Sequence, residues 1–237
     1  MKFSLCLLVV VAVSFGHASP VQHDQDQALK PLGPLFRAKL LDSDPLRAKR
    51  AARNNGLSEQ DQQTILATHN GHRGDVSPSA ANMVPLRWDA ELAASAQAWA
   101  DQCTFSHDDS SDRRTDEWWW VGQNIAYGFG YSMTSYIDSW NDEKVDYDYA
   151  SNTCASGAVC GHYTQVVWAD STFIGCGWAT CPYNYKGVTY PFDYLVCNYG
   201  PGGNFNGNKP YISGSPCSSC PRGYGGGCDS NLCTCEC

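Results

Sequence analysis

Apolar positions recur at helical spacing in two early stretches of this chain. In residues 57–73, Ser58 is a suitable N-cap, and Glu59 and Asp61 place negative charge in the first helical turn. Residues 88–103 begin with a second cap, Asp89. Four apolar positions then fall on one helical face: Leu92, Ala96, Trp99 and Cys103. We predict a helix in each stretch.

A third helix is predicted over 133–144, after the N-cap Ser132. Here Tyr136, Trp140 and Glu143 follow each other at i, i+4 and i+7, so the carboxylate shares a face with two aromatic rings. An unpaired buried charge is costly. We therefore expect Glu143 to have a partner elsewhere in the fold.

Strand patterns come later in the chain. Residues 162–169 ("HYTQVVWA") alternate and are rich in β-branched and aromatic types, which predicts a strand with His162 at its start. Further strands are predicted over 121–126, 173–179 and 194–199. Helices followed by strands with short turns indicate an α+β fold with a largely antiparallel sheet.

The N-terminal residues are typical of a secretory signal peptide, 1–18, with an apolar core and small residues before the cut. No second apolar run long enough for a membrane span follows, so we expect a soluble exported protein. Residues 19–50 contain four prolines, no cysteine and a +2 charge, and they end in Arg-Ala-Lys-Arg. We interpret them as a propeptide, with Ala51 starting the mature protein; an unprocessed flexible arm is the alternative.

The charge of the mature region narrows the possible partners. Residues 51–237 hold nine Lys and Arg against 20 Asp and Glu, a formal charge of −11. This surface repels phosphate backbones and anionic lipids. We expect no nucleic-acid partner; a cation or a basic protein surface fits better.

Twelve cysteines remain once Cys6 leaves with the signal peptide, and an even number in an exported chain favours full disulfide pairing. Six are spread over the main region and six crowd the end. A stretch rich in Gly, Pro and Asn, residues 200–216, separates the groups. We predict a main domain over 51–207 and a cysteine-rich tail over 208–237 that depends on its bridges.

Five segments together resemble one family. They are "THNGHR" (68–73), "VGQNIAYG" (121–128), "WNDEKVDYDYASNTCASGAVCGHY" (140–163), "GHYTQVVWADS" (161–171) and "YLVCNYGPGGNFNG" (194–207). In this order they resemble the CAP superfamily of cysteine-rich secretory proteins, antigen 5 and pathogenesis-related 1 proteins. The resemblance implies a three-layer α-β-α sandwich.

The resemblance also implies disulfides. In the main domain these are Cys103–Cys181, Cys154–Cys160 and Cys176–Cys197. The tail is similar to the family's hinge, which implies Cys217–Cys228 and Cys220–Cys233. Cys235 and Cys237 remain, and a bridge across one residue is strained, so the tail pairing stays open. We expect no ion-channel-regulatory module, which argues against a channel-blocking toxin.

A central cleft with two histidines and two acidic positions is the family's site. Carried over, the histidines are His107 and His162, one acid is Glu143, and Gln123 replaces the other. The resemblance implies a divalent cation, zinc or similar, bound weakly by His107 and His162, with Glu143 and Gln123 fixing the rings. The alternative is a hydrogen-bonded polar cluster that binds nothing.

Other polar and aromatic groups favour structural roles. His69 is expected to be structural and His72 exposed, although a second metal pair is conceivable at their spacing. Trp118 to Trp120 are either packed over the cleft or a binding edge, and packing is favoured. Residues 107–112 lack calcium-loop spacing and are interpreted as a solvated acidic turn.

The expected function is extracellular binding, in defence, venom or reproduction, with an extracellular protein or a sterol or lipid ligand as partner. Two alternatives follow from the resemblance: a metal-dependent endoprotease and a sterol or lipid carrier. Neither a His-Glu-x-x-His helix nor a Gly-x-Ser-x-Gly elbow is present, so enzymatic activity is not expected. If there is catalysis, the candidates are Glu143, His107 and His162.

Overall fold

The structure, a computed structural model, describes residues 56–235. The predicted signal peptide, the predicted propeptide and the start at Ala51 lie outside these residues, as does Cys237. Within 56–235 no helix is both long enough and apolar enough to cross a bilayer.

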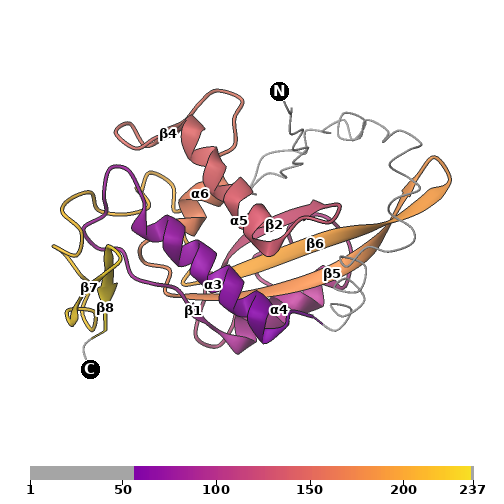
Figure 1. The fold of residues 1–237 in the computed structure, drawn as a ribbon, viewed down its shortest axis with the longest axis horizontal. Coiled ribbons are helices and arrows are strands. Elements are labelled where there is room, and N and C mark those ends of the chain that lie inside the picture. Colours follow the sequence, from indigo (N-terminus) through magenta and orange to yellow (C-terminus); the bar gives the residue numbers. More distant parts are fainter. Residues whose placement is uncertain (1–55, 236–237) are drawn as a thin grey trace.

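A four-stranded sheet in the order β1-β5-β6-β2 organises the fold (Figure 1). β5 and β6 form a long antiparallel hairpin, β2 pairs antiparallel with β6, and the short β1 runs parallel to β5. The sheet strands are β1 (Arg87–Trp88), β2 (Gly122–Gly128), β5 (Phe173–Tyr185) and β6 (Val188–Gly200). Two small ribbons are formed by β3 (Tyr147–Asp148) with β4 (Thr153–Cys154), and by β7 (Gly227–Asp229) with β8 (Leu232–Thr234).

Three helices form where the hydrophobic pattern predicts them: α3 (Glu59–Gly74), α4 (Ala90–Ala100) and α5 (Met133–Asp142). Ser58, Asp89 and Ser132 cap them as expected; Asp89 accepts from the Leu92 amide at 2.8 Å. A 3₁₀ turn, η2 (Glu143–Asp146), continues α5. Cys103 was wrongly predicted to belong to the second helix. α4 ends at Ala100, and Cys103 has a left-handed φ of 54°.

The helices cover both faces of the sheet, so the expected α+β three-layer sandwich is confirmed. α4 lies so close to β5 that a Cβ at Gly177 would stand 2.3 Å from the Gln97 Cα. Its apolar face joins Ile125, Tyr194 and Val196 in one core cluster. The other face of the sheet packs against α3 and α5. The larger core cluster on this side contains Ile65, Trp140, Trp178 and Tyr199.

The prediction of a strand over 162–169 was wrong. Residues Gly161–Val166 form a short helix, α6, in which the Thr164 amide donates to the Cys160 carbonyl at 3.0 Å. The reason lies about 90 residues away in α3. The fully buried Arg73 guanidinium donates to the Val166 and Trp168 carbonyls at 2.9 and 2.8 Å, so these groups need no sheet partner.

The tail lies against the main domain near the end of α3. The Cys233 amide donates to the Met83 carbonyl at 2.8 Å, Asn231 donates to the Gly74 carbonyl, and Leu232 is buried. The disulfides are the five pairs that the resemblance implies: Cys103–Cys181, Cys154–Cys160, Cys176–Cys197, Cys217–Cys228 and Cys220–Cys233. Cys235 has no disulfide among the described residues.

Candidate functional site

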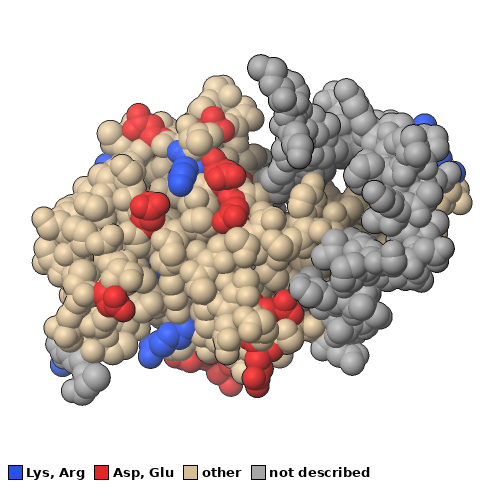
Figure 2. Space-filling model, in the orientation of Figure 1, with Lys and Arg blue, Asp and Glu red and all other residues tan. Residues whose placement is uncertain are grey.

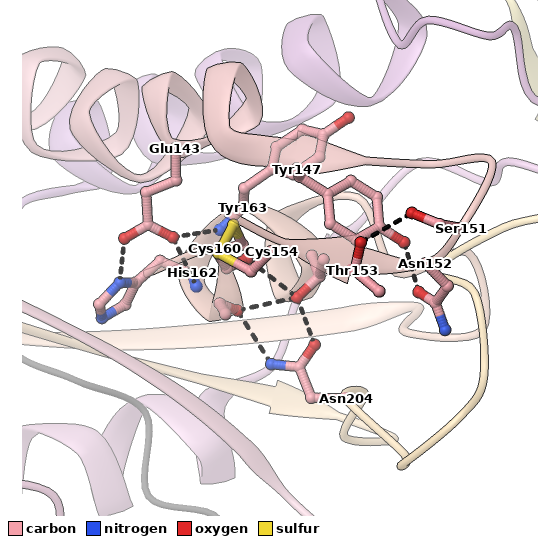
Figure 3. Close-up of a disulfide and its surroundings, with 12 residues drawn as sticks. Glu143, Tyr147, Ser151, Asn152, Thr153, Cys154, Cys160, His162, Tyr163 and Asn204 are labelled. Atoms are coloured by element: carbon pink, nitrogen blue, oxygen red, sulfur yellow. Dashed lines mark hydrogen bonds and ion pairs between the residues drawn. A yellow bond between two sulfur atoms is a disulfide. The ribbon is translucent and has the colours of Figure 1, made fainter. Parts of the chain in front are cut away.

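Glu143 and His162 form a buried pair between η2 and α6 (Figure 3). One Glu143 oxygen lies 2.6 Å from His162 Nδ1, and the other accepts from the His162 and Tyr163 amides at 2.9 and 3.1 Å. The carboxylate therefore also meets the positive end of α6. This is the partner that the sequence pattern requires for Glu143.

The pair fixes the tautomer of His162. A carboxylate only accepts, so Nδ1 carries the proton and Nε2 keeps its lone pair. The ring stacks on Trp140, with 13° between the planes and 6.2 Å between the centroids. His162 Nε2 is fully buried and has no hydrogen-bond partner among residues 56–235.

His107 is held in a similar way by Gln123. His107 Nδ1 lies 2.8 Å from Gln123 Oε1, while Gln123 Nε2 donates to Asn198 Oδ1 at 3.0 Å. The second bond orients the amide so that its oxygen faces the histidine. The Nδ1 of His107 is thus the donor, and its Nε2 is the atom able to ligate a metal.

Both histidines are attached to consecutive residues of the edge strand β2. His107 binds the side chain of Gln123, and the His162 carbonyl accepts from Asn124 Nδ2 at 3.1 Å. β2 is the last strand of the sheet, so both histidines are tied to the same sheet edge.

An ion pair beside His107 was missed by the sequence analysis. The Asp108 and Arg113 side chains are 5% and 8% exposed and lie 3.3 Å apart, so residues 107–112 are not simply a solvated turn. Burial raises the pKa of the Asp108 carboxyl, and the Arg113 guanidinium and the Gln123 amide oppose this shift. The segment also contains Asp109, Asp112 and Arg114, so the sequence does not indicate which acid pairs with which arginine.

His69 is structural, as expected. The ring is fully buried between the Ile65 carbonyl, 2.8 Å from Nδ1, and the Tyr199 hydroxyl, 2.9 Å from Nε2. Burial lowers the pKa of His69 to about 3, and the nearby Arg73 adds to this effect. Tyr199 also accepts from Asn124, so this cluster supports the strand that holds the site.

His72 and the three tryptophans differ partly from expectation. His72 is half-buried and lies 2.8 Å from Asp138 on α5, so it was wrongly expected to be exposed. Trp118 and Trp120 are half-buried, whereas Trp119 is 72% exposed. The expected packing is therefore found for Trp118 and Trp120 but not for Trp119.

Cysteines form the one cluster of three or more potential metal ligands within 56–235. It consists of Cys217, Cys220 and Cys233, whose sulfurs are all in disulfides and cannot bind as thiolates. A cavity of about 250 Å³ near α5 and α6 is lined by neither histidine. Its lining residues are Asp75, Ser77, Asn141, Lys144, Tyr147 and Tyr163.

Solved structures share this architecture. A crystal structure of NaASP2 with Zn²⁺ has a TM-score of 0.60 and 28% identity, and the match covers 76% of this chain and 98% of that one. A layered α-β-α domain with disulfides and a pair of oriented histidines thus defines the class.

Residues 66–199 match the model of the cysteine-rich secretory protein family, CAP, and the chain belongs to this family. Bovine peptidase inhibitor 16 is 42% identical over 180 residues, which are 75% of this chain and 37% of that protein. Mouse peptidase inhibitor R3HDML is 42% identical over 196 residues, covering 78% of this chain and 76% of that protein. The chain thus spans well under half the length of the first relative.

Proposed function

We propose that this chain is a secreted binding protein whose site at β2 holds a divalent cation, such as zinc, between His107 and His162. The observation that carries the proposal is that the Nδ1 atom of each ring lies within hydrogen-bond distance of an oriented oxygen, which leaves Nε2 to face a ligand. The buried Nε2 of His162 fits a cation, because a buried nitrogen without a partner is costly.

His107 and His162 would be the ligands of the cation, and Gln123 and Glu143 would fix the orientation of their rings. The bound cation would supply positive charge able to attract an anionic group of a partner. Zinc in a structure of the related NaASP2 supports this choice of metal. Five disulfides and the family's secretory members support an extracellular place of action.

Binding is favoured over proteolysis because Glu143 is fully engaged. Its two oxygens accept from two amides and one imidazole, which leaves it poorly placed as a general base for water. The lining residues of the cavity near α5 include two charged side chains and no aliphatic one, which does not favour a sterol. In the presence of zinc, we therefore expect no cleavage of a generic peptide substrate and no saturable binding of a labelled sterol.

Calorimetric zinc titration tests the site. With two protein ligands we expect a dissociation constant in the micromolar range or weaker, about 8 kcal/mol or less. His107→Ala and His162→Gln should each weaken binding at least tenfold, roughly 1.4 kcal/mol, while the matched His72→Gln variant should bind like the wild type. Unchanged binding in both site variants would contradict the proposal.

A variant expected to bind zinc more tightly complements these losses, because misfolding cannot explain a gain of zinc affinity. Gln123→Glu places a carboxylate behind His107, which makes its Nε2 a stronger donor and adds a negative charge near the cation. We expect zinc affinity to rise about tenfold in the folded variant, although loss of the Nε2 donor to Asn198 should lower the free energy of unfolding of the metal-free protein. Equal or weaker affinity in this folded variant would count against a His107 ligand.

A further inference from the structure

The segment Trp118–Trp120 holds two indoles in place and turns the third outward. Trp118 packs against Phe173 with 5.7 Å between centroids. Trp120 Nε1 donates to the Gly203 carbonyl at 3.1 Å, and the Trp120 carbonyl accepts from the Gly202 amide at 2.8 Å. Trp119, fixed on both sides by its neighbours, is 72% exposed.

Trp119 belongs to an exposed cluster of rings, which we call the aromatic platform: Trp119, Trp120 and Phe205. The three centroids lie 6.2 to 6.4 Å apart, and Phe205 is itself 39% exposed. Phe205 also packs against the buried Trp168, with 6.1 Å between the ring centroids. The platform is therefore supported from below, and little side-chain freedom remains for a partner to remove.

Two carboxylates stand at the edge of this platform. The Thr115 amide donates to the Trp118 carbonyl, and the Trp118 amide donates to Thr115 Oγ1, which closes a tight turn. Asp116 and Glu117 occupy its tip, and both are exposed. Arg114 is the one exposed cation between residues 111 and 120, against Asp112, Asp116 and Glu117, so this edge is net negative.

We propose that the aromatic platform and the Asp116–Glu117 turn form a docking surface for an arginine-bearing segment of a partner protein. A guanidinium stacks on an indole and offers paired N–H donors to carboxylates, which matches a ring beside two acids. An exposed, supported tryptophan is also the residue type that dominates protein interfaces. The acidic character of the chain, with a formal charge of −8, points to a basic partner.

This surface is independent of the proposed cation site. Neither His107 nor His162 belongs to it, and its chemistry requires a cationic side chain rather than a metal. A phospholipid surface is the other occupant that exposed aromatic rings suggest. The acidic turn disfavours anionic headgroups. On the one face shown in Figure 2, acidic side chains are more prominent than basic ones.

The test is a matched pair of blocked peptides, each with three arginines or three citrullines separated by Gly-Ser. Citrulline keeps the planar shape and removes the charge. We expect the arginine peptide to bind more tightly, with affinity falling as salt rises. Trp119→Ala should weaken it about two- to fivefold, and Glu117→Gln should weaken it and flatten the salt dependence. A chelator should change nothing, which separates this surface from the cation site.

Matched controls lie elsewhere on the surface. Val145→Ala removes an apolar side chain that is 81% exposed, and Glu91→Gln removes an exposed charge from α4. Both should leave peptide affinity unchanged. Equal affinity for both peptides, no effect of Trp119→Ala, or an equal loss in Glu91→Gln would overturn the proposal. Trp119-dependent binding to phosphatidylcholine vesicles without peptide binding would overturn it as well and assign the platform to lipid.

Discussion

At the scale of single residues, the two fully buried histidines His69 and His162 have different roles. His69 uses both ring nitrogens within the protein, one with the Ile65 carbonyl and one with the Tyr199 hydroxyl. His162 uses Nδ1 with Glu143, and its Nε2 has no hydrogen-bond partner in the described part of the chain. The first ring stabilises the fold, and the second is available to a ligand.

The low pKa of His69 predicts a pH dependence of stability. Burial lowers the pKa of this ring to about 3 in the folded state, against about 6.5 when unfolded. The unfolded chain therefore binds more protons between these values, and the free energy of unfolding falls as pH drops from 6.5 toward 3. Between pH 7 and 5 the contribution of His69 is about 2 kcal/mol.

Urea unfolding at both pH values checks this contribution. His69→Gln lowers stability at pH 7, because it disturbs a buried network, but its further loss between pH 7 and 5 should be about 2 kcal/mol smaller than in the wild type. His72→Gln is a suitable control on the same helix. An identical pH slope in wild type and His69→Gln would mean that His69 is not the group responsible.

At the scale of elements, local sequence predicted α3, α4 and α5 because their caps and apolar stripes are contained in their own residues. The helix α6 could not be predicted in this way. Val166 and Val167 favour a strand locally, and the groups that change the outcome are the distant Arg73 and the Glu143 carboxylate at the start of α6. The same holds for the site. The resemblance implied that Glu143 and Gln123 orient the two histidines but not which group faces which ring, and no sequence pattern indicated the Asp108–Arg113 pair.

Two glycines give a test of the packing between α4 and the sheet. Gly177→Ala places a Cβ 2.3 Å from the Gln97 Cα, so α4 must shift, and we expect a loss of about 1–3 kcal/mol. Gly71→Ala, on the exposed face of α3, meets nothing within 4 Å and should stabilise by about 0.5–1 kcal/mol. Chemical unfolding with the disulfides intact measures both. A neutral Gly177→Ala would contradict the close contact.

At the scale of the whole molecule, two of the disulfides differ strongly in exposure. Cys176 and Cys197 face each other across β5 and β6 and are 3% and 0% exposed. Cys228 is exposed and its partner Cys217 is partly exposed, since the tail has few apolar residues to cover them. The core thus shields Cys176–Cys197, whereas Cys217–Cys228 is open to solvent.

This difference predicts an order of reduction. Under mild reductant without denaturant, Cys217–Cys228 should open well before Cys176–Cys197, because thiolate attack needs access to the sulfur. Alkylation at timed points followed by peptide mass analysis gives the order. Early labelling of Cys176 or Cys197, before any tail cysteine, would show that the core does not shield this bridge.

Anomalous scattering from a crystal grown with zinc locates the proposed cation at β2. Data on both sides of the zinc absorption edge identify the metal without assumptions about the ligands. We expect one dominant peak within about 2.1 Å of the Nε2 atoms of both His107 and His162. A peak at His72 and Asp138, at one histidine alone, or in the cysteine-rich tail would contradict it.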